Sequence, residues 1–193
     1  MSGERRPFVE WLSRLLIATG LLCLGWVGLV SSEAILFRRA QLQAMVSMTA
    51  ETANAAAAPA TLPGGSPLGV LAIPRLGFAE AVAQGEDEST LSIAIGHLPD
   101  TPMPWHHGNS GFAGHRTTHF RRLKDVRIGD ELLLTTPHGR FRYVVRQTLI
   151  VDPSDVWVLD PTPGRQLTLI TCYPFTYVGR APKRFIVSAV ERR

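Results

Sequence analysis

Cys172 is the side chain in this sequence that is best placed to act as a nucleophile. It ends the apolar, β-branched run of residues 166–172, and Tyr173-Pro174 interrupts that run directly afterwards. A strand that stops at a cysteine puts the thiol at the end of the strand, beside a loop. A thiolate becomes a reactive nucleophile when a base or a cation stabilises it. The alternative is a small buried core residue, which is common for free cysteines.

His115 is the histidine whose surroundings favour proton transfer. It follows the short segment 108–114, in which small residues flank Phe112, and Gly114 directly precedes it. Glycine beside a histidine lets another backbone or a substrate come close. An imidazole can act as acid and as base near neutral pH, so His115 is the candidate proton carrier. The alternative is a solvated histidine in a loop.

Arg184 is a candidate for holding a developing negative charge. It lies twelve residues after Cys172 and begins the apolar run 184–190. If this run pairs with residues 166–172 as neighbouring strands, the pairing brings Arg184 close to Cys172. A guanidinium keeps its charge at any working pH and can stabilise an oxyanion. The alternative is a surface charge on an edge strand, which is the role we expect for Lys183.

The elements that must position these side chains are short strands. Five apolar, β-branched runs are separated by turn residues, and residues 136–139 read as a hairpin turn between two of them. The helix candidate is residues 88–95, with Ser89 or Thr90 near its start. We therefore predict a mostly β domain, either a small closed barrel or a sandwich. The five runs are residues 70–73, 131–135, 141–151, 166–172 and 185–190.

The N-terminal part of the chain has the composition of a membrane anchor. Residues 15–32 carry no charge and are about as long as a bilayer crossing requires. We expect an uncleaved signal anchor there, with residues 1–14 in the cytoplasm, although a cleaved signal peptide or a buried helix would also be apolar. Residues 33–66 read as a juxtamembrane helix followed by a linker rich in Ala, Pro and Gly. Residues 67–193 would then form the catalytic domain, outside the cytoplasm on a single-pass membrane protein.

Composition excludes several classes of protein. The net charge of +4, from 20 Lys and Arg against 16 Asp and Glu, is too mild for the dense basic stripe of a nucleic-acid binder. Two cysteines exclude a disulfide framework and any four-cysteine metal site. His115 and His119 have the i, i+4 spacing of a zinc site on a helix, but the neighbouring glycines and threonines disfavour a helix. We expect no metal and no cofactor.

Three motifs together resemble the sortase family. They are Thr168-Leu169-Ile170-Thr171-Cys172, the Ala-Gly-His of residues 113–115, and the arginine that opens the final strand. The similarity covers residues 69–190 and is strongest to class D sortases. It implies an eight-stranded sortase-type β-barrel with one or two short helices, and a cysteine transpeptidase with His115, Cys172 and Arg184 as its catalytic residues. Thr117 stands where many relatives carry Asp, and His119 has no counterpart in this triad.

The resemblance also implies a substrate class. Sortases cleave a C-terminal sorting signal of Leu-Pro-x-Thr-Gly/Ala type and transfer the acyl fragment to an amine, from a cell-wall precursor or a pilin lysine. Two alternatives remain open: a cysteine peptidase that acts mainly by hydrolysis, and a non-catalytic membrane-tethered β-domain. In sortases the loop before the cysteine strand helps form the peptide groove. Trp157, Val158 and Leu159 of that loop would either line the groove or fill the core, and we expect the core.

Overall fold

The computed structural model describes the C-terminal domain and a few residues near the N-terminus. The segments 1–14, 15–32 and 33–66, which we expect to be a cytoplasmic segment, an anchor and a linker, lie almost entirely outside the described residues. Within the described part of the chain, no helix combines the length and the apolar character that a membrane crossing requires. The described residues are 62–177, 179–192, and, in helical conformation, Trp11, Arg14, Ile17, Thr19 and Leu21.

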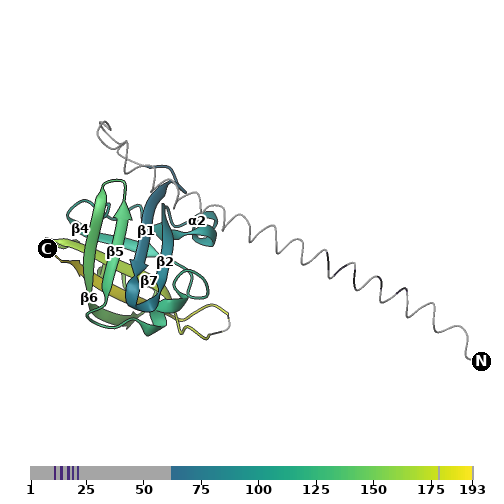
Figure 1. Cartoon of the computed structure of the whole chain (residues 1–193). Helices are drawn as coiled ribbons and strands as arrows, with labels where there is room; N and C mark the ends of the chain where they lie inside the picture. Colours follow the sequence, from purple (N-terminus) through teal and green to yellow (C-terminus); the bar gives the residue numbers. More distant parts are fainter. Residues whose placement is uncertain are drawn as a thin grey trace, which may run out of the picture. The chain divides into compact units, whose positions relative to one another are not determined.

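Eight strands of the described domain close into one barrel, in the order β1-β2-β3-β4-β7-β8-β6-β5. Figure 1 shows β6, β5, β1 and β2 side by side on one wall. The closed barrel predicted from the sequence is confirmed, and the sandwich is excluded. The strands are β1 Pro67–Ile73, β2 Phe78–Gln84, β3 Ile95–His97, β4 Gly108–Ala113, β5 Glu131–Thr136, β6 Gly139–Val151, β7 Arg165–Tyr173 and β8 Lys183–Glu191.

The helical elements are short, as we expected. The α-helix α2 covers Glu88–Ile93 rather than residues 88–95, because Ile95 already belongs to β3, which pairs in parallel with β2. The side chain of Asp87, and not Ser89 or Thr90, caps the helix by accepting a hydrogen bond from the Thr90 amide. Three 3₁₀ segments complete the described domain: η1 Pro74–Leu76, η2 Arg121–Asp125 and η3 Val156–Leu159.

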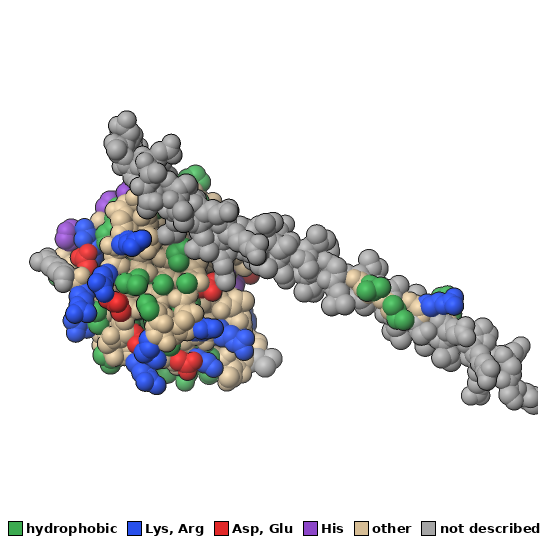
Figure 2. Space-filling model, viewed as in Figure 1, with side chains coloured by type: hydrophobic (Ala, Val, Ile, Leu, Met, Phe, Trp, Pro, Cys, Tyr) green, Lys and Arg blue, Asp and Glu red, His purple; other side chains and the backbone are tan. Residues whose placement is uncertain are grey.

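The barrel interior is apolar. Its largest fully buried side chains include Phe112, Phe120 and Tyr143. The Tyr143 hydroxyl donates a hydrogen bond to the Pro104 carbonyl oxygen, and burial raises the pKa of this tyrosine. The wall requires glycine at position 69, where φ is +153° and a Cβ would lie 2.1 Å from the carbonyl oxygen of Thr135. On the outside, Figure 2 shows acidic and basic side chains interspersed over the visible face.

Two strand pairings determine where the predicted site residues lie. β4 pairs with β7 in parallel, so both strands end at the same end of the barrel. β8 pairs with β7 in the antiparallel sense, so β8 begins at that end of the barrel. His115 follows the end of β4, Cys172 lies near the end of β7, and Arg184 lies near the start of β8. Residues that are far apart in the sequence therefore meet at one end of the barrel.

Candidate active site

Cys172 and Arg184 lie directly opposite each other in the ladder between β7 and β8. Directly opposed residues of an antiparallel pair share one face of the sheet, with Cβ atoms about 4.5–5.5 Å apart. The pairing of these two strands, expected from the sequence, is confirmed. The Cys172 thiol is free and half-buried, so it is neither sealed in the core nor fully solvated. This position makes the sulfur accessible to a substrate.

His115 reaches the same place through an extension of the β4–β7 pairing. Ala113 is the register partner of Ile170, and the Gly114 amide donates a hydrogen bond of 3.2 Å to the Ile170 carbonyl oxygen. The ladder ends at Ala113, and His115 lies two residues beyond it, at the end of the barrel where β7 carries Cys172.

Gly114 allows the chain to turn at the end of β4. A Cβ at this position would lie 2.7 Å from Cδ2 of Phe120, whose ring is buried in the barrel. The amide of Phe120 donates a hydrogen bond of 3.0 Å to the His115 carbonyl oxygen, which closes a turn after the histidine. The structure therefore explains why a small residue precedes His115: the backbone at Gly114 packs against the ring of Phe120.

The carboxylate of Glu88 is a neighbour of His115 that sequence reasoning missed. Its Oε1 lies 3.5 Å from Nε2 of His115. The Glu88 side chain is 85% exposed, and solvent screens such a pair, so its contribution to stability is small. Its presence follows from α2, which begins at Glu88 and connects two strands of the barrel. No sequence motif signals it, because 27 positions separate the two residues.

Arg184 hydrogen-bonds to its own chain in this structure. Its Nη1 donates to the carbonyl oxygens of Lys183, at 3.1 Å, and Ala181, at 3.5 Å. The guanidinium is half-buried and lies at the end of the loop that follows Cys172. The strand register therefore brings Arg184 beside the cysteine, while its hydrogen bonds tie it to the loop. Lys183, which we expected to be solvated, has an exposed side chain that forms an ion pair with Asp152 at 2.8 Å.

His119 is not part of a metal site with His115. The segment between the two histidines is a turn rather than a helix, so the spacing does not bring both rings to one face. His119 is buried, and its Nδ1 lies 3.0 Å from Oε2 of Glu80, whereas His115 contacts a different carboxylate. Among the residues that the structure describes, no group of three or more metal-ligating side chains forms a cation site.

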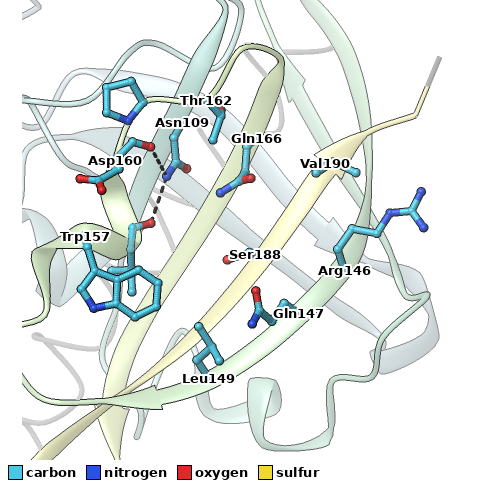
Figure 3. Close-up of a pocket in the computed structure, with 12 residues that line it drawn as sticks. Asn109, Arg146, Gln147, Leu149, Trp157, Asp160, Thr162, Gln166, Ser188 and Val190 are labelled. Carbon is cyan, nitrogen blue, oxygen red and sulfur yellow. Dashed lines mark hydrogen bonds between the residues drawn. The ribbon is translucent and has the colours of Figure 1, made fainter.

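The loop before β7 packs on the same outer face as the cysteine. Asn109 fastens it by donating hydrogen bonds to the carbonyl oxygens of Val158 and Asp160, at 3.0 and 3.2 Å (Figure 3). Val158 is buried, as we expected, but Trp157 is 53% exposed, so the core position predicted for the tryptophan is wrong. Trp157 borders a hollow of about 230 Å³ near Gln166, six residues before Cys172 on β7.

Comparisons with known proteins agree with this geometry. Residues 71–192 match the model of the sortase domain family. Sortase D of Bacillus subtilis is 38% identical over 124 residues, which cover 64% of this chain and 63% of that relative. Sortase SrtE1 of Streptomyces coelicolor is 33% identical over 151 residues, which cover 68% of this chain and 43% of that relative. The chain thus spans less than two thirds of either relative.

A solved structure gives the same result for the fold. The Sortase D5 transpeptidase of Clostridium perfringens superposes with a TM-score of 0.62 and 29% identity, over 68% of this chain and 82% of that chain. The matches to D-type sortases agree with the class D resemblance of the sequence. Since the family model spans more than half of the chain and its strands form the matching barrel, this protein belongs to the sortase family.

Proposed function

We propose that this protein is a cysteine transpeptidase that uses Cys172 as its nucleophile, His115 as its proton carrier and Arg184 as its oxyanion-stabilising cation. The observation that carries the proposal is the strand register: Arg184 is the partner of Cys172, and β4, which His115 follows, ends beside β7 at the same end of the barrel. Membership of the sortase family supports the same three roles.

In the first half-reaction, the Cys172 thiolate attacks the carbonyl carbon of the scissile peptide bond. A carbon–sulfur bond forms, and the carbonyl electrons move to the oxygen, where the Arg184 guanidinium stabilises the negative charge. When the tetrahedral intermediate collapses, the carbon–nitrogen bond breaks. The imidazolium of His115 gives its proton to the departing amine, and a thioester on Cys172 remains.

In the second half-reaction, an amine attacks the thioester. Neutral His115 takes a proton from the incoming nitrogen, a new amide bond forms, and the carbon–sulfur bond breaks to release the thiolate. One histidine serves both halves because its acid and base roles reverse. The net result exchanges one amide for another, which requires no oxidant, reductant or cofactor.

The substrate we propose is a protein that ends in a Leu-Pro-x-Thr-Gly/Ala-like sorting signal. The acceptor would be an amine of a cell-wall precursor or a pilin lysine, so the product would be a protein attached to the cell surface or a pilin polymer. The support for this part is the family resemblance of the residues around Cys172, including the run 168–172.

We further propose that residues 15–32 anchor the protein in the cell membrane as a single span, with the catalytic domain outside the cytoplasm. The support is the uncharged stretch itself, with Arg14 before it and Arg38 after it. Fractionation and protease protection of the full-length chain in bacterial cells would test this arrangement.

The test of the activity is a peptide assay with two products. The protein is incubated with Leu-Pro-x-Thr-containing peptides and either triglycine or a lysine peptide, and mass spectrometry identifies the joined product. We expect joining by the wild type, none by Cys172→Ala, and a thioester adduct on the wild type when no amine is added. Hydrolysis without joining, despite excess amine, would favour the peptidase alternative. Undiminished activity of Cys172→Ala would overturn the proposal.

A further inference from the structure

The loop of residues 174–182 joins the two opposed residues of the site, because it begins after Cys172 and ends before Arg184. Its first part is held by aromatic packing. The Phe175 ring lies 6.2 Å from the Tyr173 ring and 5.3 Å from the Phe185 ring, measured between centroids. These contacts hold the loop where it leaves β7 and where β8 begins. A side chain from another segment contacts the middle of the loop.

Arg116 supplies that contact. It directly follows His115, and its Nη2 donates hydrogen bonds to the carbonyl oxygens of Tyr177, at 2.7 Å, and Gly179, at 3.2 Å. Charged donors make stronger hydrogen bonds than neutral ones, and the planar guanidinium can serve two acceptors at once. The other terminal nitrogen, Nη1, is buried and has no hydrogen-bond partner among the described residues, and the side chain as a whole is half-buried.

The far end of the same loop accepts hydrogen bonds from Arg184. Within the loop, the Ala181 carbonyl oxygen accepts from its Nη1 at 3.5 Å, and the second acceptor, at 3.1 Å, is the carbonyl oxygen of Lys183, the first residue of β8. The loop is therefore held by two arginines: one that follows His115 in the chain and one that opposes Cys172. A displacement of the loop at Ala181 moves this acceptor of Arg184 and so changes where its guanidinium lies.

We propose that Arg116 is a positioning residue that couples the His115 segment to the 174–182 loop and thereby places Arg184 next to Cys172. This inference rests on the transpeptidase function proposed above. Arg116 does not touch the reacting atoms; it holds the loop in which the Ala181 carbonyl oxygen accepts a hydrogen bond from Arg184. Small displacements of a catalytic group lower the rate by large factors, so loss of this tether lowers the rate without altering the three catalytic side chains.

The variants Arg116→Gln and Arg116→Lys test the tether, with Arg121→Gln as the matched control. Arg121 is an exposed arginine five residues further along the chain. We expect Arg116→Gln to lower kcat/KM by about 10–100-fold. Arg116→Lys should fall between this variant and the wild type, because lysine keeps the charge but lacks the planar pair of donors. Arg121→Gln should match the wild type. Equal activity of all four proteins would overturn the proposal.

A second experiment measures the local flexibility of the loop by limited proteolysis, independently of catalysis. Trypsin can cleave after Arg180, which is exposed within the loop, and the fragment masses identify the cut. Cleavage there requires local freedom of the backbone. We expect faster cleavage after Arg180 in Arg116→Gln than in Arg121→Gln, at an unchanged melting temperature. Unchanged cleavage at this bond would contradict the proposed role, and so would a lowered melting temperature that accounts for the whole loss of activity.

A double-mutant cycle separates positioning from general support of the fold. If Arg116 acts through Arg184, Arg116→Gln should cost about twofold or less in an Arg184→Ala background, where the cation it positions is absent. Full additivity of the two losses would overturn the inference. Failure of the proposed function is recognised separately: in that case Cys172→Ala is as active as the wild type, or the wild type is inactive, while the trypsin result still reports on the tether.

Discussion

The Thr171 hydroxyl donates a hydrogen bond of 2.7 Å to the carbonyl oxygen of Gly114. This bond joins the residue before Cys172 to the residue before His115, inside the barrel wall. Thr171 is buried in the barrel wall, whereas the Cys172 thiol is half-buried, so this link lies away from the thiol. The position of His115 relative to Cys172 should therefore depend on a buried contact.

Replacing Thr171 with valine tests this link. The variant keeps the shape of the side chain but leaves the Gly114 carbonyl oxygen without its side-chain partner at a site where Thr171 is only 2% exposed. We expect a loss of about 1–3 kcal/mol in the free energy of unfolding, measured with urea, and a lower kcat/KM. Thr171→Ser, which keeps the hydroxyl, should retain most of the stability and most of the kcat/KM of the wild type. A valine variant with wild-type kinetics would show that the link does not position His115.

Gly114→Ala should displace the histidine. The new Cβ would lie 2.7 Å from Cδ2 of Phe120, so the backbone at His115 or the ring has to move. We expect kcat to fall by about tenfold or more, because His115 no longer lies beside the thiol. The double variant Gly114→Ala with Phe120→Leu replaces the rigid ring with a smaller side chain that can rotate away from the new Cβ, and it should recover part of the activity. If it recovers none, the steric explanation is wrong.

Arg184→Lys should be strongly impaired although it keeps the positive charge. A lysine ammonium cannot reproduce the planar donors of a guanidinium. We expect kcat for acylation to fall by about 10²–10³-fold, the range found when one oxyanion donor is removed. Rapid-quench measurement of thioester formation gives this rate directly. Arg180→Lys, at an exposed position in the neighbouring loop, is the control and should acylate at the wild-type rate.

The stability of the barrel should fall in mild acid because of His97. Its ring is 1% exposed, with Nδ1 2.9 Å from the Gln84 Oε1 and Nε2 3.1 Å from the Pro102 carbonyl oxygen. Burial lowers the pKa of His97 below its ordinary value of 6.5. The unfolded chain therefore binds this proton more readily than the folded chain does. The stabilisation is complete above pH 6.5 and is lost as the pH falls from there toward the folded pKa.

Urea unfolding at about pH 7.5 and about pH 5.5 measures this effect. We expect the free energy of unfolding of the wild type to drop between the two conditions. His97→Gln, which has no titrating ring, should show a smaller drop from a lower starting value. The same pH dependence in both proteins would assign the acid sensitivity to other groups.

Much of the barrel follows from local sequence patterns, and the exceptions have physical causes. The runs that became β5, β6, β7 and β8 were recognisable because they are rich in apolar and β-branched residues. β2, Phe78–Gln84, was missed because alanines occupy three of its seven positions and alanine favours helix over strand. β3 has three residues and is defined only by its partners, so no local pattern indicates it.

Some contacts of the candidate site could also be predicted from the sequence, and others could not. Cys172 and Arg184 could be placed together from the sequence because two neighbouring strands in the chain pair directly. The contacts of Glu88 with His115 and of Arg116 with Tyr177 could not, because they join segments whose proximity depends on barrel closure. Trp157 was placed in the core on its apolarity alone, whereas the geometry of η3 buries its neighbour Val158 and leaves the indole outside.

The order of the strands along the chain also sets the order in which this end of the barrel can be completed. During synthesis, the strand that carries His115 and the strand that carries Cys172 are complete before β8 exists. At that stage β7 lacks the partner strand that carries Arg184 and that fills the gap between β7 and β6. The guanidinium therefore comes to lie opposite Cys172 only when the last strand closes the wall.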